Sequence, residues 1–322
     1  METYGQPSFT ALTAAAARAA HLIVDGEPAI FADTMAGVML GERAEEFLAY
    51  HQEHGTHPVL AGARAQVTCR SRYAEDHLAR AVKGGIRQYV ILGAGLDTFA
   101  YRSLLARRVR VFEVDHPATQ EWKRRARPSP EVPGSVTFVP ADLLADSRGD
   151  GLRRAWPGPE VPGPVAFVPA DLLADSLGDG LRRAGFDFGA PAFVSWLGVT
   201  MYLDDGAIER TAAVVGGLAP GTELVVDYML PAGLRDAAGD SYAEQVGQAS
   251  AERGEPWLSL FTPDAMAALL ARCGFGPARD VSQREMIPAG LWDRPDGLRP
   301  TELSHIAHAV VAPADHAGLG GR

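Results

Sequence analysis

Short runs of continuously apolar residues alternate with helical stretches along most of the chain, and this alternation limits the possible folds more than any other feature. Most runs lead into Gly, Asp or Pro, and apolar residues occupy successive positions rather than every second one. Strands of this kind are buried on both faces, as in a parallel sheet covered by helices. The runs are residues 88–92, 109–114, 136–139, 165–168, 192–196, 223–227 and 306–311. The sequence therefore predicts an α/β fold with a doubly wound, mostly parallel sheet.

Segments with a different pattern precede and interrupt this region. Residues 1–85 carry apolar residues at helical spacing, so we expect a helical N-terminal extension. Residues 86–229 are predicted to form the α/β core, which residues 264–322 complete. Between them, residues 230–263 are polar and rich in Gly and Ala, with a helical stretch near 241–253. Because this segment follows a strand's carboxyl end, we expect a lid insertion over a ligand crevice; an exposed insertion without a role is the alternative.

The predicted core contains a near-verbatim tandem duplication. Residues 157–184 repeat residues 128–155 with four substitutions, at an offset of 29 residues. Two copies are too few for a solenoid, so one duplicated strand-helix unit is the simpler interpretation. Both copies contain Val-Pro-Ala-Asp-Leu, which makes Asp142 and Asp171 equivalent. A right-handed crossover places the first copy beside the strand at 109–114, so we expect Asp142 at the site and the second copy farther out or looped out of the sheet.

The charge balance and the cysteine count exclude several classes of function. Forty acidic residues against thirty basic ones give a formal net charge of -10, which opposes binding to nucleic acid. Cys69 and Cys273 are too few for a disulfide framework, which indicates a reducing compartment. The sequence also lacks the pattern of a signal peptide and an apolar run long enough for a membrane span. We therefore expect a cytoplasmic protein with no nucleic-acid or membrane partner.

A glycine-containing turn follows the first predicted strand and indicates a nucleotide-type site. Gly93 and Gly95 let a ligand approach the backbone closely, and the helix expected at 99–106 offers free N–H groups at its start. Thr98 occupies the place of the third glycine of a dinucleotide fingerprint. The turn alone is therefore weak evidence for any one cofactor.

Acidic residues at the ends of the next two predicted strands strengthen this interpretation. Glu113 lies twenty positions after Gly93, where an acid can accept hydrogen bonds from both ribose hydroxyls. A salt bridge to Arg102 or Arg110 is the alternative for Glu113. Asp142 could accept from an adenine amino group while the next residue, Leu143, packs on the ring, with helix capping as the alternative.

Six motifs, in order along the chain, connect these residues to a known family. They are Arg70–Tyr73 with Glu75-Asp76, Tyr89–Thr98, Phe112–Pro117, Phe138–Asp142, Ser195–Leu203 and Gly254–Trp257. From about Thr10 to Pro313, the chain resembles class I S-adenosylmethionine-dependent methyltransferases of the leucine carboxyl methyltransferase type, and more closely their actinobacterial branch. The resemblance implies a Rossmann-like fold, S-adenosylmethionine as cofactor, and O-methylation of a carboxylate or hydroxyl on a small molecule of secondary metabolism.

The resemblance also implies roles for residues at matching positions. Arg70 would bind the methionine carboxylate, and Trp196 and Leu197 would approach the amino-acid end of the cofactor. Eukaryotic members have, in place of Leu197, a glutamate that helps to hold the cofactor's ammonium group. The residues expected to bind the cofactor are Arg70, Gly93, Ala94, Gly95, Asp97, Glu113, Val114, Asp142, Leu143, Trp196 and Leu197.

Methyl transfer from a sulfonium needs alignment and exclusion of water, and a carboxylate acceptor needs no general base. No Ser/His/Asp triad is visible, and His51, His54 and His57 have the spacing of a loop, so we assign no catalytic residue and expect no metal. Two alternatives stay open. One is a repurposed or non-catalytic S-adenosylmethionine-binding protein. The other is an NAD-dependent oxidoreductase, against which Thr98 and the Asp142-Leu143 motif argue.

Overall fold

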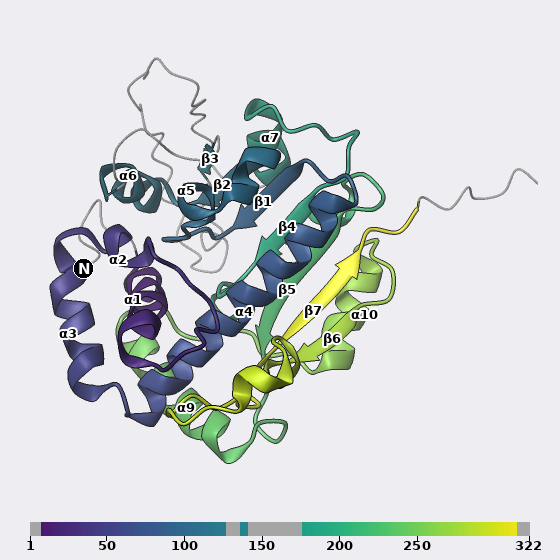
Figure 1. Cartoon of the computed structure of the whole chain (residues 1–322). Helices are drawn as coiled ribbons and strands as arrows, with labels where there is room; N and C mark the ends of the chain where they lie inside the picture. Colours follow the sequence, from purple (N-terminus) through teal and green to yellow (C-terminus); the bar gives the residue numbers. More distant parts are fainter. Residues whose placement is uncertain (1–7, 127–135, 141–175, 314–322) are drawn as a thin grey trace, which may run out of the picture.

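The strands of the computed structural model form one mixed sheet (Figure 1). The structure describes residues 8–126, 136–140 and 176–313. The strands are β1 (Gln88–Leu92), β2 (Arg110–Asp115), β3 (Val136–Pro140), β4 (Phe193–Trp196), β5 (Glu223–Met229), β6 (Arg279–Ser282) and β7 (Ser304–Val310). Their order in the sheet is β3-β2-β1-β4-β5-β7-β6. The first five are parallel, whereas β7 pairs antiparallel with both β5 and β6, which confirms the predicted mostly parallel α/β fold.

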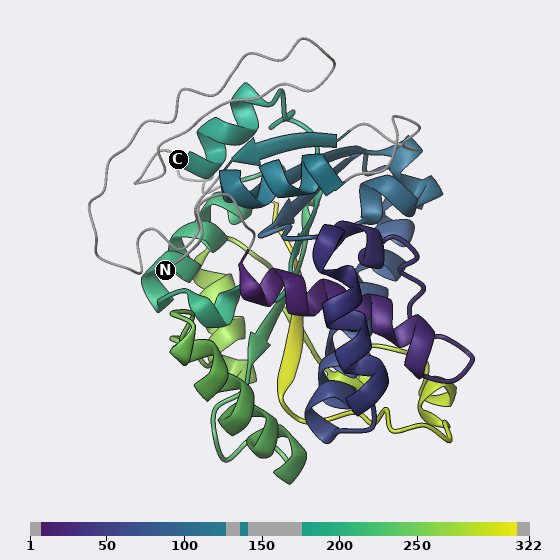
Figure 2. The ribbon, with the colours of Figure 1, turned by 90° about the vertical axis from the view of Figure 1, so that its left-hand side faces the viewer.

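Helices cover both faces of the sheet. They are α1 (Phe9–Val24), α2 (Ala36–Met39), α3 (Ala44–His54), α4 (Pro58–Lys83), α5 (Phe99–Arg102), α6 (Pro117–Ala126), α7 (Ser176–Arg183), α8 (Asp205–Gly216), α9 (Ala237–Glu252) and α10 (Pro263–Arg272), with short 3-10 helices η1 (Gly41–Arg43), η2 (Leu104–Arg108), η4 (Thr200–Tyr202), η5 (Gln283–Glu285) and η6 (Ala289–Trp292). One apolar cluster lies under α1 and α4, and a second lies under α7, α8 and α10. Figure 2 shows the N-terminal helices on one side of the sheet and α7, α8 and α10 on the other. No described helix is both long and apolar enough to cross a membrane.

The predicted strands that fall within the described residues are present, but the sequence pattern missed β6. This strand, Arg-Asp-Val-Ser, is at the sheet edge and buries only Val281, which pairs with Ile306 of β7. An edge strand with one buried side chain has no apolar run for sequence reasoning to find. The predicted strand at 165–168 lies outside the described residues.

Two local predictions are wrong. The helix expected at 99–106 is interrupted, because α5 ends at Arg102 and the 3-10 helix η2 follows. The histidines expected in a loop are helical or helix-capping: His51 and His54 belong to α3, and the His57 side chain accepts from Val59 N–H at the start of α4. His51 is buried, with Nδ1 3.4 Å from Nη1 of Arg64. In the described part of the chain, no group of three or more His, Cys, Asp or Glu side chains is arranged to hold a metal.

The N-terminal extension is tied to the glycine-containing turn through the buried carboxylate of Asp33. Arg18 of α1 donates from Nε to Asp33 Oδ2 at 2.8 Å and from Nη2 to the Leu96 carbonyl at 2.7 Å. The Thr98 hydroxyl donates to Asp33 Oδ1 at 2.6 Å and accepts from Arg102 Nε at 3.0 Å. Thr98, at the position of the third glycine, therefore contributes its hydroxyl to this buried network.

Each copy of the duplicated unit contributes one described element. The strand β3 comes from the first copy and pairs with β2, which confirms the predicted neighbour of β2. The helix α7 comes from the second copy and buries Leu177 and Leu181 in the apolar cluster under α7, α8 and α10. Asp142, Leu143 and Asp171 lie outside the described residues.

Two of the four differences between the copies give a physical reason for this division. Leu177 of α7 is buried, whereas the first copy has Arg148 at this position, and burying a cation without a partner is unfavourable. Thr137 of β3 corresponds to Ala166 in the second copy, and a β-branched residue favours a strand more than alanine does. The first copy thus has the better strand and the second copy the better helix.

We expect a chain that lacks residues 148–176 to fold with nearly the stability of the full chain. Ser147 then takes the place of Ser176, and one strand and one helix of the duplicated unit remain. The matched control lacks residues 149–177 and differs at a single position, where it keeps Arg148 in place of Leu177. Burying that arginine costs about 2 kcal/mol or more, so the control should melt several degrees lower in thermal unfolding. Equal melting temperatures for the two variants would contradict the interpretation.

A second prediction concerns Asp33. Burial acts to raise the pKa of Asp33, but the charges of Arg18 and Arg102 outweigh it and hold the pKa below its ordinary value of 3.8. Asp33→Asn should lower the free energy of unfolding by about 3 kcal/mol at pH 7, because it leaves buried cations without their counterion. The control Asp76→Asn removes an exposed i,i+4 pair with Arg72 and should cost less than about 0.5 kcal/mol.

The pH dependence gives a second measurement on the same variant. A carboxylate whose pKa is lower in the folded chain stabilises the fold above its unfolded pKa, and this stabilisation is lost as the pH falls through the folded pKa. The difference between wild type and Asp33→Asn in urea unfolding should therefore shrink below about pH 4. A difference that stays constant down to pH 3 would be inconsistent with the ion-pair role.

Candidate functional site

The glycine-containing turn lies at the carboxyl end of β1. At β1 the strand order changes direction, because β2 and β3 lie on one side of this strand and β4 and β5 lie on the other. β1 pairs with β2 on one side and with β4 on the other. The connections from these strands leave in opposite directions, and ligands of open α/β sheets bind at such a switch point. The residues that follow β1, β2 and β4 are therefore brought together at one edge.

The backbone of the turn needs glycine at both predicted positions. Gly93 and Gly95 have φ angles of 63° and 49°, in the left-handed region that other residues rarely adopt. A Cβ on Gly93 would lie 2.3 Å from Cγ2 of Val199, and one on Gly95 would lie 3.5 Å from Cβ of Ala11. Between them, the Ala94 N–H donates to the Val114 carbonyl at 3.1 Å. The turn is thus held between the end of β2, the residue before η4 and the first turn of α1.

Arg70 reaches the same edge of the sheet from α4 and is fixed there by Asp227 of β5. Its Nη1 lies 2.9 Å from Oδ2 of Asp227, whose side chain is 1% exposed. Asp227 Oδ1 accepts from the Gly198 N–H at 2.6 Å, and a Cβ on Gly198 would lie 2.4 Å from Arg70 Nη2. Asp227 therefore positions the guanidinium after β4. Sequence reasoning missed Asp227, and its only signal was an acid inside an apolar strand.

Glu113 is buried and paired, but with neither of the partners considered from the sequence. Its Oε2 lies 2.7 Å from Lys123 Nζ of α6, and both side chains are 1% exposed. Arg102 pairs with Glu75 instead, and Arg110 donates to the Gly185 carbonyl. Burial raises the pKa of Glu113 to about 7, although Lys123 opposes the shift. The second oxygen, Oε1, has no hydrogen-bond partner among the described residues, so it is available to a donor on a ligand.

Asp115, which the sequence analysis does not assign to the site, faces the turn directly. Successive strand residues alternate between faces, so Asp115 lies on the same side of β2 as Glu113. Its carboxylate accepts from the N–H of Gly95 and, at 2.6 Å, from the N–H of His116. Burial raises the pKa of Asp115, although these two N–H groups oppose the shift. The sequence signal that could have identified Asp115 is its position, two residues after Glu113 at the end of the strand.

The remaining predicted residues occupy different surroundings. Asp97 Oδ1 accepts from the N–H of Phe99, the first residue of α5, at 2.8 Å, so Asp97 lies at the end of the turn. The indole of Trp196 is 1% exposed and packs in the apolar cluster under α8 and α10, on the opposite face of the sheet from Glu113. Leu197 is partly buried against the other cluster, under α1 and α4. The structure thus brings together Arg70 and the residues of the turn with Asp97, Glu113 and Val114.

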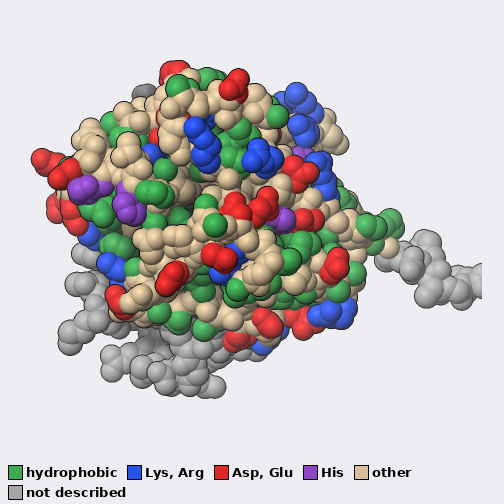
Figure 3. Space-filling model, turned by 90° about the horizontal axis from the view of Figure 1, so that it is seen from below, with side chains coloured by type: hydrophobic (Ala, Val, Ile, Leu, Met, Phe, Trp, Pro, Cys, Tyr) green, Lys and Arg blue, Asp and Glu red, His purple; other side chains and the backbone are tan. Residues whose placement is uncertain are grey.

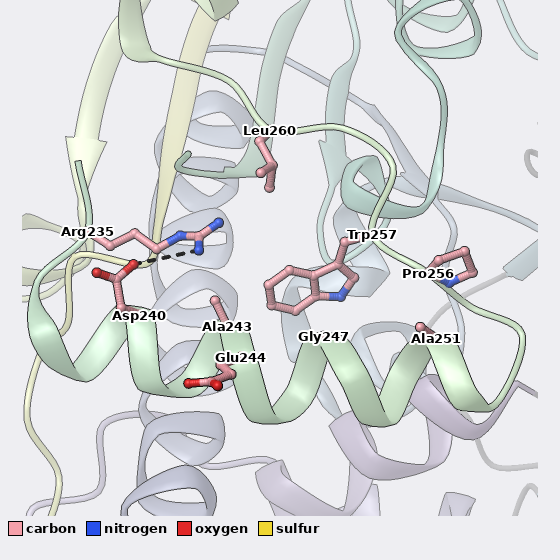
Figure 4. Close-up of a pocket in the computed structure, with 9 residues that line it drawn as sticks. All are labelled: Arg235, Asp240, Ala243, Glu244, Gly247, Ala251, Pro256, Trp257 and Leu260. Carbon is pink, nitrogen blue, oxygen red and sulfur yellow. Dashed lines mark ion pairs between the residues drawn. The ribbon is translucent and has the colours of Figure 1, made fainter. Parts of the chain in front are cut away.

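A surface pocket lies on the segment from 230 to 263 (Figure 4). It has a volume of about 380 Å³ and contains the indole of Trp257, which faces α9. Arg235 and Asp240 form an ion pair of 3.7 Å at one end. Its lining residues are Arg235, Asp240, Ala243, Glu244, Gly247, Ala251, Pro256, Trp257 and Leu260. None of the residues expected to bind the cofactor lines this pocket.

The chain matches a known family over most of its length. Residues 11–216 match the model of the leucine carboxyl methyltransferase family. A Bacillus subtilis protein named "Putative S-adenosyl-L-methionine-dependent methyltransferase YktD" is 28% identical over 332 residues, covering 95% of this chain and 98% of the relative. A Mycobacterium tuberculosis protein of the same description, Rv1729c, is 42% identical over 79 residues, or 24% of this chain and 25% of the relative.

One solved structure supports the fold. A crystal structure from Thermobifida fusca superposes with a TM-score of 0.52 at 17% identity and covers 96% of both chains. The family model spans more than half of the chain, and its region contains Arg70, the glycine-containing turn and Glu113. The chain therefore belongs to the leucine carboxyl methyltransferase family of S-adenosylmethionine-dependent methyltransferases.

Proposed function

We propose that the chain transfers a methyl group from S-adenosylmethionine to an oxygen atom of a small molecule, either a carboxylate or a hydroxyl, in secondary metabolism. The observation that carries the cofactor site is the buried Oε1 of Glu113, which lacks a donor among the described residues. A ribose hydroxyl would supply that donor beside the left-handed glycines of the turn. The residues present thus fit the nucleoside of the cofactor.

The other predicted binding residues fit around this contact. Arg70 would bind the methionine carboxylate with guanidinium N–H groups not used by Asp227, while Asp227 keeps it in place. Gly93, Ala94 and Gly95 would line the methionine and ribose. The assignments of Asp142 and Leu143 to adenine, and the approach of Leu197 to the amino-acid end, stay predictions.

When bound, S-adenosylmethionine supplies an electrophilic methyl group on a sulfonium. The contribution of the chain is to hold donor and acceptor in line and to exclude water. The segment 230–263 is suited to the second task, because its helix α9 packs on α4, with the Tyr242 ring 3.2 Å from the place of a Cβ on Gly62. We infer that this segment covers the acceptor.

The face of the molecule shown in Figure 3 supports a small-molecule acceptor rather than a polyanion. Acidic and basic side chains are interspersed over the face shown in Figure 3, without a continuous basic patch. This arrangement matches the net charge of -10.

Calorimetry with S-adenosylhomocysteine tests the proposal directly. We expect binding of S-adenosylhomocysteine and no binding of NADH, because the turn has Thr98 in place of the glycine that dinucleotide sites use. Incubation with S-adenosylmethionine and panels of carboxylic acids and phenols should then release S-adenosylhomocysteine. Binding of NADH without binding of S-adenosylhomocysteine would show that the proposal is wrong.

A further prediction compares two arginines on α4. Arg70→Ala should weaken S-adenosylhomocysteine binding about ten- to a hundred-fold, because it removes a charged hydrogen bond in a site that is largely out of water. The control, Arg72→Ala, removes a half-exposed pair with Asp76 and a hydrogen bond to the Ile30 carbonyl, neither of which involves a predicted cofactor-binding residue, and should leave the affinity unchanged. Calorimetry on both variants decides, and equal losses would contradict the assignment of Arg70.

A further inference from the structure

Glu255 is a buried carboxylate that no described cation neutralises. Its residue is 8% exposed, and its Oε2 accepts a single hydrogen bond, at 2.9 Å, from the Thr10 hydroxyl. The acids of the candidate site have other partners. Asp227 forms an ion pair with Arg70, and Glu113 forms one with Lys123. Asp115 accepts hydrogen bonds from two backbone N–H groups. Burying a carboxylate with only a hydroxyl partner is unfavourable, so Glu255 is suited to a cationic ligand.

Contacts on one side place Glu255 near the glycine-containing turn through α1. Thr10, which donates to Glu255, is in the first turn of this helix. The next residue, Ala11, has its Cβ 3.5 Å from the place of a Cβ on Gly95. The first turn of α1 therefore lies between Gly95 and Glu255.

Contacts on the other side place it near the turn through η4. Leu258, three residues after Glu255, donates from its N–H to the Met201 carbonyl at 2.6 Å. Val199, the residue before η4, would contact a Cβ on Gly93 at 2.3 Å. The segment that carries Glu255 thus contacts α1 on one side and η4 on the other. Ala11 of α1 lies against Gly95, and Val199, just before η4, lies against Gly93.

The phenol of Tyr202 links Glu255 to the cation that is expected to bind the cofactor. Burial, and then the negative charge of Glu255, raise the pKa of Tyr202, whereas the charge of Arg70 lowers it. Glu255 and Arg70, an anion and a cation, therefore both act on the partly buried side chain of Tyr202.

The methionine end of the cofactor is a zwitterion and needs one partner of each sign. Arg70 supplies the cation, and Leu197 offers no charge for the ammonium group. We propose that Glu255 binds this ammonium group, a contact that rests on the cofactor site proposed above. Thr10 then orients the carboxylate with the hydrogen bond that the structure shows.

The test compares two ligands on two proteins by calorimetry. The ligands are S-adenosylhomocysteine and its analogue in which hydrogen replaces the amino group. Glu255→Gln keeps the size of the side chain and an oxygen that accepts from Thr10. We expect this variant to bind S-adenosylhomocysteine about ten- to a hundred-fold more weakly than wild type does, and to bind the deaminated analogue as wild type does.

A matched control separates this role from a general effect of removing a carboxylate in this segment. Glu252→Gln removes the charge of an exposed carboxylate three residues earlier, which accepts from Gln248 of the same helix, so its affinity for S-adenosylhomocysteine should stay within about three-fold of wild type, less than the effect of one charged hydrogen bond. An equally large loss in Glu252→Gln, or an equal loss of both ligands in Glu255→Gln, would overturn the inference. Unchanged affinity in Glu255→Gln would also overturn it.

The wild type itself gives a measurement that does not depend on folding of a variant. It should bind the deaminated analogue about ten- to a hundred-fold more weakly than S-adenosylhomocysteine. Equal affinities would refute an ammonium contact while leaving the proposed function intact. Absence of binding of both ligands would reject the proposed function together with this inference.

Discussion

The geometry of the glycine-containing turn depends on the buried carboxylate of Asp33. This group holds Arg18, Thr98 and Arg102, and Arg18 in turn holds the Leu96 carbonyl. Two cations on one buried anion are stable only while all three stay in place, since a lone buried charge is strongly unfavourable. The helix α1 is therefore part of the surroundings of the candidate site, because its Ala11 lies against Gly95 and its Thr10 donates to Glu255.

The acids at the carboxyl edge of the sheet have distinct tasks because they have distinct partners. Asp227 pairs with the guanidinium of Arg70 and positions it. Asp115 accepts hydrogen bonds from backbone N–H groups and fixes the glycine-containing turn. Glu113 has one oxygen engaged and one without a described partner. Among these acids, only one with unused hydrogen-bonding capacity, such as Glu113, can add a hydrogen bond to a ligand.

Sequence reasoning correctly predicted the parts of the fold in which apolar residues recur at a regular spacing. The buried parallel strands and the long helices α1 and α4 follow from apolar spacing, whereas β6 has a single buried side chain and left no pattern. Within the candidate site, the glycines and Arg70 were predicted from motifs. Asp227 was not, because its partner Arg70 lies 157 residues away in sequence. Sequence reasoning included Glu255 only as part of the motif Gly254–Trp257. That no described cation pairs with this carboxylate can be seen only in the folded structure.

The division of β3 and α7 between two copies has a consequence for how such a chain can change. A duplication that spans one whole strand-helix unit adds length without altering the register of any later element. The copies differ at a buried position of α7, where Leu177 corresponds to Arg148, and in β3, where Thr137 corresponds to Ala166. The two copies are therefore no longer interchangeable as sources of β3 and α7.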